Sequence, residues 1–162
     1  MSKYQGARLE WQDFKGVVPE VNAAVQALSQ IAAKAGLDKS LLELIKIRAS
    51  QINGCAFCVQ YHILTAETLG VPADKLNLLA VWREAPVFSD RERAALAWTE
   101  SLTTLGHGVD DDVYNGARAE FSESELAYLS SAVAVINVWN RFGVAYRWTP
   151  QARQKKSQAA AS

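Results

Sequence analysis

The 162-residue sequence has no excess charge of either sign, because 17 Lys and Arg residues balance 17 Asp and Glu residues. It has no long basic block, so it lacks the attraction on which non-specific binding to nucleic acid or to an anionic membrane surface depends. No run approaches the roughly 18 apolar residues that a membrane-spanning helix needs. We therefore expect small molecules or other proteins as partners, and neither nucleic acid nor membrane.

A secretory signal is also missing from the start of the sequence, since residues 1–11 carry charges and no apolar stretch. This predicts a cytoplasmic protein, whose paired thiols stay reduced until they are oxidised during a reaction. Residues 151–162 are rich in Gln, Ala, Lys and Ser, which predicts a disordered tail. Because 49% of the chain is apolar, we expect residues 1–150 to form a single domain with a buried core.

Strand signals are absent, because no segment combines period-2 alternation with enrichment in β-branched residues. Apolar residues instead recur at helical spacing between cap and stop signals, such as the capping boxes that begin at Ser89 and at Ser122. The sequence therefore predicts an all-α fold. The expected helices cover, in order, about residues 21–35, 38–53, 55–69, 74–84, 89–105, 111–119 and 123–146.

The chain has only two cysteines, Cys55 and Cys58. They are too close in sequence to close a long loop, as a structural disulfide would, and this spacing indicates redox or metal chemistry. If Cys55 begins a helix, then Cys55, Cys58 and His62 lie on one helix face. The positive end of the helix would favour a thiolate, and the two sulfurs could form a disulfide without a large chain movement.

These side chains suit the reduction of a hydroperoxide. Attack of a thiolate on the O–O bond gives a sulfenic acid, which condenses with the second thiol to a disulfide. The leaving oxygen needs a proton, which His62 can supply. Glu43 can hold the imidazole if the preceding helix folds back through the turn at 53–54. A zinc site with Cys55, Cys58 and His62 as three of its ligands stays open, although a closed structural site needs four.

In order and spacing, Glu43, Cys55, Cys58 and His62 resemble the active-site pattern of the alkylhydroperoxidase AhpD family, within the wider carboxymuconolactone decarboxylase-like superfamily. The resemblance is closest over residues 41–79, and the run Ile-Asn-Val-Trp-Asn-Arg-Phe is similar to the peroxidase-related branch. The resemblance implies an AhpD-like bundle of about six to eight helices, without a cofactor or metal. It also implies a homo-oligomer, often a trimer or hexamer, and peroxide reduction by thiols.

The same resemblance implies a role for each residue. In the family the second cysteine attacks the peroxide and the first resolves it, which assigns Cys58 and Cys55 to these steps. The Glu and the His form a proton relay, which assigns Glu43 and His62. An external dithiol, a lipoyl-bearing protein in some relatives, then reduces the disulfide. AhpD has a second histidine between its cysteines where this chain has Phe57, so the relay expected here is shorter.

Two other functions are compatible with the cysteine pair: general thiol–disulfide exchange, and redox sensing in which oxidation changes oligomer packing. The lactone decarboxylase branch is disfavoured, because it does not rely on paired cysteines. Three tryptophans are predicted to fill the core or subunit contacts: Trp82, Trp98 and Trp139. Three polar residues of the longest predicted helix are expected to form hydrogen bonds between helices or subunits: Asn137, Asn140 and Arg141.

Overall fold

The computed structural model describes residues 6–153 and, over that range, contains eight α-helices, one 3₁₀ helix and no strand. The all-α prediction is therefore confirmed. The helices are α1 (Trp11–Val17), α2 (Pro19–Lys34), α3 (Lys39–Ile52), α4 (Ala56–Thr68), α5 (Ala73–Leu78), η1 (Leu79–Val81), α6 (Asp90–Thr103), α7 (Asp111–Glu120) and α8 (Glu123–Tyr146). None of these helices combines the length and apolar character that a membrane span requires. Of the predicted tail, 151–153 carry no helix and 154–162 lie outside the described residues.

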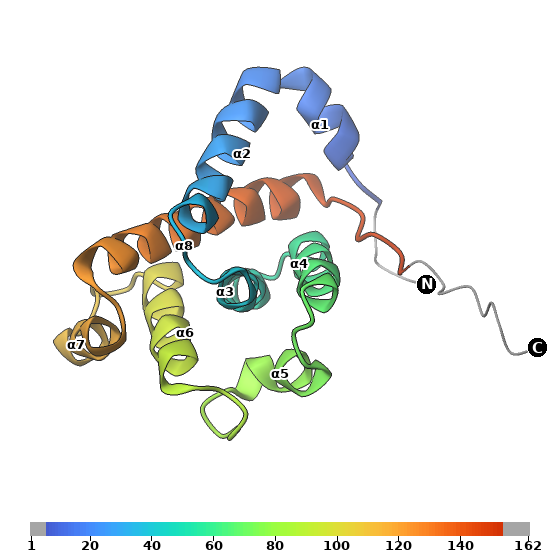
Figure 1. Cartoon of the computed structure of the whole chain (residues 1–162). Coiled ribbons are helices and arrows are strands. Elements are labelled where there is room, and N and C mark those ends of the chain that lie inside the picture. Colours follow the sequence, from blue (N-terminus) through green and yellow to red (C-terminus); the bar gives the residue numbers. More distant parts are fainter. Residues whose placement is uncertain (1–5, 154–162) are drawn as a thin grey trace, which may run out of the picture.

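Helix α3 lies at the centre of the molecule and contacts α4, α6 and α8 (Figure 1). Its side chains are buried almost throughout, and Leu44, Ile45 and Ile47 are completely enclosed. The longest helix, α8, crosses the molecule between α3 and the arm formed by α1 and α2 (Figure 1). Because both sides of α8 are covered in this way, its sequence shows a wide apolar surface rather than a narrow stripe.

The turn between α3 and α4 reverses the chain and brings the two helices side by side. Helix α3 begins at the cap Asp38, whose side chain accepts a 2.8 Å hydrogen bond from the backbone N–H of Leu41. It ends before Gly54, whose φ of +69° is a left-handed conformation that glycine adopts without steric cost. Helix α4 then returns along α3, as the sequence predicts for this turn.

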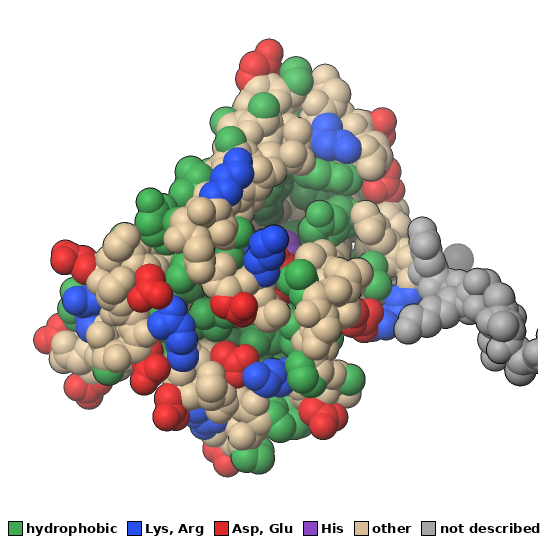
Figure 2. Space-filling model, viewed as in Figure 1, with side chains coloured by type: hydrophobic (Ala, Val, Ile, Leu, Met, Phe, Trp, Pro, Cys, Tyr) green, Lys and Arg blue, Asp and Glu red, His purple; other side chains and the backbone are tan. Residues whose placement is uncertain are grey.

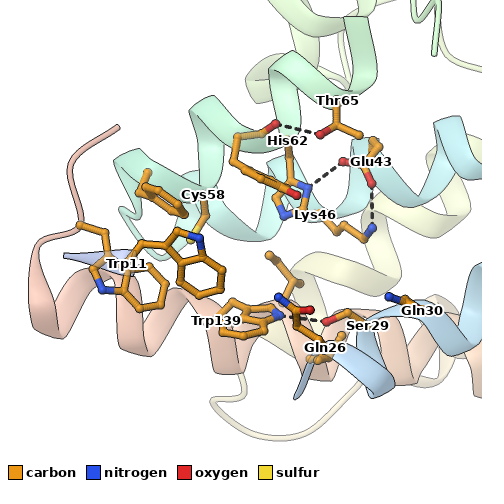
Figure 3. Close-up of a pocket in the computed structure, with 15 residues that line it drawn as sticks. Trp11, Gln26, Ser29, Gln30, Glu43, Lys46, Cys58, His62, Thr65 and Trp139 are labelled. Atoms are coloured by element: carbon orange, nitrogen blue, oxygen red, sulfur yellow. Dashed lines mark hydrogen bonds and ion pairs between the residues drawn. The ribbon is translucent and has the colours of Figure 1, made fainter. Parts of the chain in front are cut away.

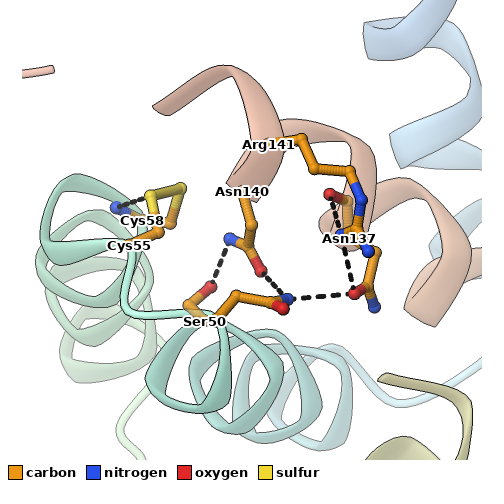
Figure 4. The surroundings of a disulfide bond; sticks show 7 residues. Ser50, Cys55, Cys58, Asn137, Asn140 and Arg141 are labelled. Atoms are coloured by element: carbon orange, nitrogen blue, oxygen red, sulfur yellow. Dashed lines mark hydrogen bonds between the residues drawn. A yellow bond between two sulfur atoms is a disulfide. The ribbon is translucent and has the colours of Figure 1, made fainter. Parts of the chain in front are cut away.

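Polar side chains tie this turn to α8 (Figure 4). The Asn53 side-chain amide donates hydrogen bonds to the side-chain oxygens of Asn137 and Asn140, both at 2.9 Å. The amide of Asn140 in turn donates to Ser50 Oγ at 2.9 Å. Buried polar groups are costly unless they are paired, so this network fixes the turn against α8. The interhelical bonds predicted for Asn137 and Asn140 are confirmed, whereas Arg141 donates within α8 to the backbone oxygen of Asn137.

Two elements differ from the sequence prediction. Helix α1 was not predicted, because seven residues are too few to show helical periodicity. The single helix predicted over 74–84 is instead α5 followed by the 3₁₀ helix η1. A 3₁₀ turn has three residues per turn and therefore places Leu79 and Trp82 on the same side, where both are buried.

Helix α2 turns an apolar stripe outward. Val21, Leu28 and Ile31, three of the residues whose spacing predicts this helix, are 42%, 39% and 41% exposed, and Ala32 is the only buried residue of α2. Figure 2 shows hydrophobic side chains at the surface along this helix. The stripe therefore lacks a partner within the described part of the chain.

The two ends of the described chain are joined to each other. The backbone N–H of Arg8 donates to the oxygen of Tyr146 at 2.9 Å. The hydroxyl of Thr149 donates to a carboxylate oxygen of Glu10 at 2.7 Å. These bonds hold α1 beside the segment that follows α8, and so bring Trp11 next to residues near the end of the chain.

Candidate redox site

A cavity of about 300 Å³ lies between α2, α3, α4 and α8, with α1 and the segment after α8 at one end. Three of the four predicted site residues line it: Glu43, Cys58 and His62 (Figure 3). The fourth, Cys55, is buried beside Cys58 but does not line the cavity. The structure thus brings all four residues together and gives the two cysteines different surroundings.

The cysteine pair stands at the start of α4. Cys55 is the N-cap residue, and its Sγ accepts a 3.3 Å hydrogen bond from the backbone N–H of Cys58. The two residues form a disulfide, with their Cα atoms 5.3 Å apart (Figure 4). Both are almost fully buried, Cys55 at 2% and Cys58 at 3% exposure. Of the two cysteines, only Cys58 therefore borders the cavity.

Gly143 of α8 packs against the disulfide and does not line the cavity. A Cβ atom at this position would lie 2.6 Å from Cys55 Sγ, 3.3 Å from Cys58 Sγ and 3.3 Å from Cε3 of Trp148. Only a glycine lets α8 pass this close to the two sulfurs. Sequence reasoning missed Gly143, and the signal for it was a glycine inside a continuous helical pattern, where glycine costs helix stability.

Glu43 connects His62 to Lys46 by two short hydrogen bonds (Figure 3). Its carboxylate oxygens lie 2.7 Å from His62 Nδ1 and 2.7 Å from Lys46 Nζ. A carboxylate accepts at both positions, so a neutral imidazole carries its proton on Nδ1 and leaves Nε2 unprotonated. Lys46 was not singled out from the sequence, although it follows Glu43 by three residues on the same helix.

Burial and hydrogen bonding act in opposite directions on these two groups. Burial raises the pKa of Glu43, but the hydrogen bonds from His62 and Lys46 and the positive charge of Lys46 outweigh it, so that this pKa lies below its usual value. Burial lowers the pKa of His62 by more than the bond to Glu43 raises it. At neutral pH the pair is therefore a carboxylate and a neutral imidazole that can accept a proton at Nε2.

Aromatic rings form the wall of the cavity beside Cys58. Trp11 contacts the rings of Phe57, Trp139 and Trp148, with centroids 6.0, 5.2 and 4.9 Å apart. Tyr61 is stacked on Phe57 at 6.2 Å and also lines the cavity.

The prediction that tryptophans fill the core holds for Trp82 and Trp98, which are buried. Trp139 is partly buried against the cluster that contains Cys55 and Cys58, and it also lines the cavity.

Polar groups from α2 face this wall. Gln26, Ser29 and Gln30 line the cavity on the side opposite His62 (Figure 3). Ser29 Oγ accepts a 2.9 Å hydrogen bond from the indole N–H of Trp139, which fixes the orientation of that ring. Over residues 6–153, no three His, Cys, Asp or Glu side chains are grouped so that they could hold a metal ion.

Residues 19–101 match the model of the carboxymuconolactone decarboxylase family. The chain is 32% identical over 130 residues to the uncharacterised protein YdfG of Bacillus subtilis, covering 80% of this chain and 88% of that protein. It is also 32% identical over 109 residues to the uncharacterised protein YnjA of Escherichia coli, covering 67% of this chain and 60% of that protein.

A solved structure from Agrobacterium tumefaciens has the same fold, with a TM-score of 0.85 and 36% identity over 91% of this chain and 99% of that one. That protein is described as one of unknown function with a suggested role in antioxidant defence as an AhpD. The debrominase Bmp8, at 20% identity, has a TM-score of 0.77 over 85% of this chain and 74% of its own, which shows a shared fold. The AhpD-like architecture expected from the resemblance is confirmed.

We expect Gly143→Ala to make the disulfide easier to reduce. The added Cβ would collide with Cys55 Sγ, which the disulfide holds in place, whereas a free thiol can rotate away. Overpacking of this kind costs about 1–3 kcal/mol, which raises the reduction potential by roughly 20–65 mV. Redox titration in thiol–disulfide buffers measures this change. The control is Gly116→Ala in α7, where an added Cβ meets no atom within 4 Å, and equal potentials for the two variants would contradict the prediction.

The pKa of His62 should respond with opposite sign to changes in its two charged neighbours. Glu43→Gln removes the carboxylate that favours the imidazolium, so the pKa of His62 should fall further. Lys46→Met removes a positive charge that disfavours the imidazolium, so this pKa should rise. NMR titration of the oxidised protein measures both changes, with the signal of His107, the only other histidine, as internal reference. Shifts of the same sign in the two variants would refute this electrostatic description.

Proposed function

The chain belongs to the carboxymuconolactone decarboxylase family, and from this premise we propose that it is a thiol-dependent peroxidase acting on hydrogen peroxide or an organic hydroperoxide. One observation carries the proposal: a cysteine that can form a disulfide with its neighbour shares a cavity with a hydrogen-bonded Glu–His pair. The role in antioxidant defence suggested for the Agrobacterium protein, 36% identical to this chain, supports the same activity.

In the proposed reaction Cys58 attacks the peroxide. The neutral His62 accepts the thiol proton at Nε2, and the thiolate attacks one oxygen, so that an S–O bond forms as the O–O bond breaks. The imidazolium returns the proton to the leaving oxygen, which departs as an alcohol, or as water from hydrogen peroxide. Glu43 stabilises the imidazolium while it exists. Proton transfer of this kind typically contributes about 10²- to 10⁴-fold to the rate.

Cys55 completes the oxidation. Its sulfur attacks the sulfenic sulfur of Cys58, and a disulfide and one water form. An external dithiol then reduces the disulfide by thiol–disulfide exchange. Because Cys58 lines the cavity and Cys55 does not, we propose that the dithiol also approaches through the cavity and attacks Cys58. A reducing compartment such as the cytoplasm would supply this reductant, for which a lipoyl-type dithiol is the candidate.

Substitution of each cysteine should separate the two steps. Reduced wild-type protein should lose both thiols with one equivalent of hydroperoxide, Cys55→Ser should accumulate a sulfenic acid on Cys58 that dimedone traps, and Cys58→Ser should not react. His62→Ala should slow wild-type oxidation by about 10²- to 10⁴-fold. Thiol titration, mass spectrometry and stopped-flow kinetics measure these outcomes.

Three results would contradict the proposal. A sulfenic acid that is trapped only in Cys58→Ser would exchange the roles of the two cysteines. Unchanged thiols under all hydroperoxides, together with rapid exchange with added disulfides, would favour a general thiol–disulfide oxidoreductase. Disulfide formation without turnover under any dithiol would instead favour a redox-sensing protein.

We also propose that the protein is a homo-oligomer, a trimer or a hexamer, in which the apolar stripe of α2 is covered by a second copy. The exposed Leu28 belongs to this stripe, and burial of such surface is the main force of association. Leu28→Glu should therefore lower the mass measured by light scattering. The control is Leu105→Glu, which changes a leucine that is 66% exposed outside α2. A wild-type monomer at micromolar concentration would contradict this proposal.

A further inference from the structure

We infer that the cavity selects hydroperoxides that carry an aromatic ring, with the ring seated against Trp11 and Trp139 and the O–O bond at Cys58. This inference rests on the proposed peroxidase function and specifies its substrate. Three properties of the cavity carry it: its volume, the composition of its wall and its charge.

The volume exceeds what hydrogen peroxide needs. A water molecule takes about 30 Å³ of liquid volume, and hydrogen peroxide is only slightly larger, whereas the cavity has about 300 Å³. Cavities of this size are typical of sites for organic ligands. Cys58 therefore borders a space that a much larger molecule can fill.

The wall beside Cys58 is aromatic and held in place before any substrate arrives. Trp11 meets Trp139 edge-to-face at 5.2 Å, with an interplanar angle of 79°. The hydrogen bond from Trp139 to Ser29 and the packing of Trp11 on Trp148 at 4.9 Å fix both rings. In Figure 3 Trp11 and Trp139 both lie near Cys58. A further ring gains from edge-to-face or offset contacts with such a wall beyond the burial of its area.

The charge of the cavity favours a neutral substrate over one with a carboxylate. Of the described residues that line the cavity, Lys46 is the only Lys or Arg, and its Nζ lies 2.7 Å from Glu43, the only Asp or Glu. Because this cation is already paired, it adds little attraction for a second anion. Gln26, Gln30, Ser29 and Thr65 add polar but uncharged groups to the lining.

The balanced reaction consumes one aromatic hydroperoxide and two thiols. The S–O bond to Cys58 forms as the O–O bond breaks, the aromatic alcohol leaves with the proton from His62, and disulfide formation with Cys55 releases water. The two electrons that reduce the peroxide come from the two sulfurs.

The inference can be tested with two hydroperoxides that differ only by a phenyl ring. Cumene hydroperoxide carries a phenyl group where tert-butyl hydroperoxide carries a methyl group, and their reactive groups are the same. We expect wild-type oxidation by cumene hydroperoxide to have a second-order rate constant at least about tenfold higher. Trp11→Leu should reduce this ratio to about threefold or less. The control Tyr114→Leu changes an exposed aromatic residue of α7 outside the cavity and should keep the ratio.

A binding measurement separates this inference from the proposed function. Cys58→Ser protein should bind 2-phenyl-2-propanol, the alcohol product, in a saturable manner and should not bind tert-butanol at the same concentrations. Tryptophan fluorescence measures the binding of each alcohol. If both hydroperoxides oxidise the protein at equal rates, the aromatic inference is overturned and the peroxidase function stands. If neither hydroperoxide reacts, the peroxidase function fails, and the aromatic inference falls with it unless the alcohol binds.

Discussion

The close approach of α8 to the start of α4 is the constraint on which the rest of the site depends. The missing side chain at Gly143 lets the helix backbone lie against both sulfurs, and the asparagine network at Asn53 and Asn140 holds the end of α3, just before α4, against α8. Since α8 covers Cys55, only Cys58 lines the cavity. One packing contact thus gives two chemically identical residues different access to the cavity.

The buried carboxylate of Glu43 depends on its charged and polar neighbours. An isolated charge at the position of Glu43 would be strongly disfavoured by desolvation. The bonds from Lys46 and His62 use both oxygens of the carboxylate, so that the charge is kept without an unpaired acceptor. The cost of burying the charge is met by the same contacts that orient the imidazole.

Much of the fold could be predicted because its signals are local. The capping boxes at Ser89 and Ser122 begin helices as predicted, and the turn before Cys55 allowed Glu43 and His62 to be expected together. Gly143 and the aromatic wall could not be predicted in the same way. They depend on how helices pack that are far apart in sequence, and neither periodicity nor residue spacing encodes that packing.

The pairing of the chain ends has a consequence for how the molecule is completed during synthesis. The bond between Glu10 and Thr149 joins residues 139 positions apart, and Trp11 rests on Trp148. Helices α3 and α4, by contrast, are neighbours in sequence and can pair as soon as both have left the ribosome. The bond between Glu43 and His62 spans only 19 positions, whereas the aromatic wall cannot be complete before Trp139 and Trp148 have both been translated.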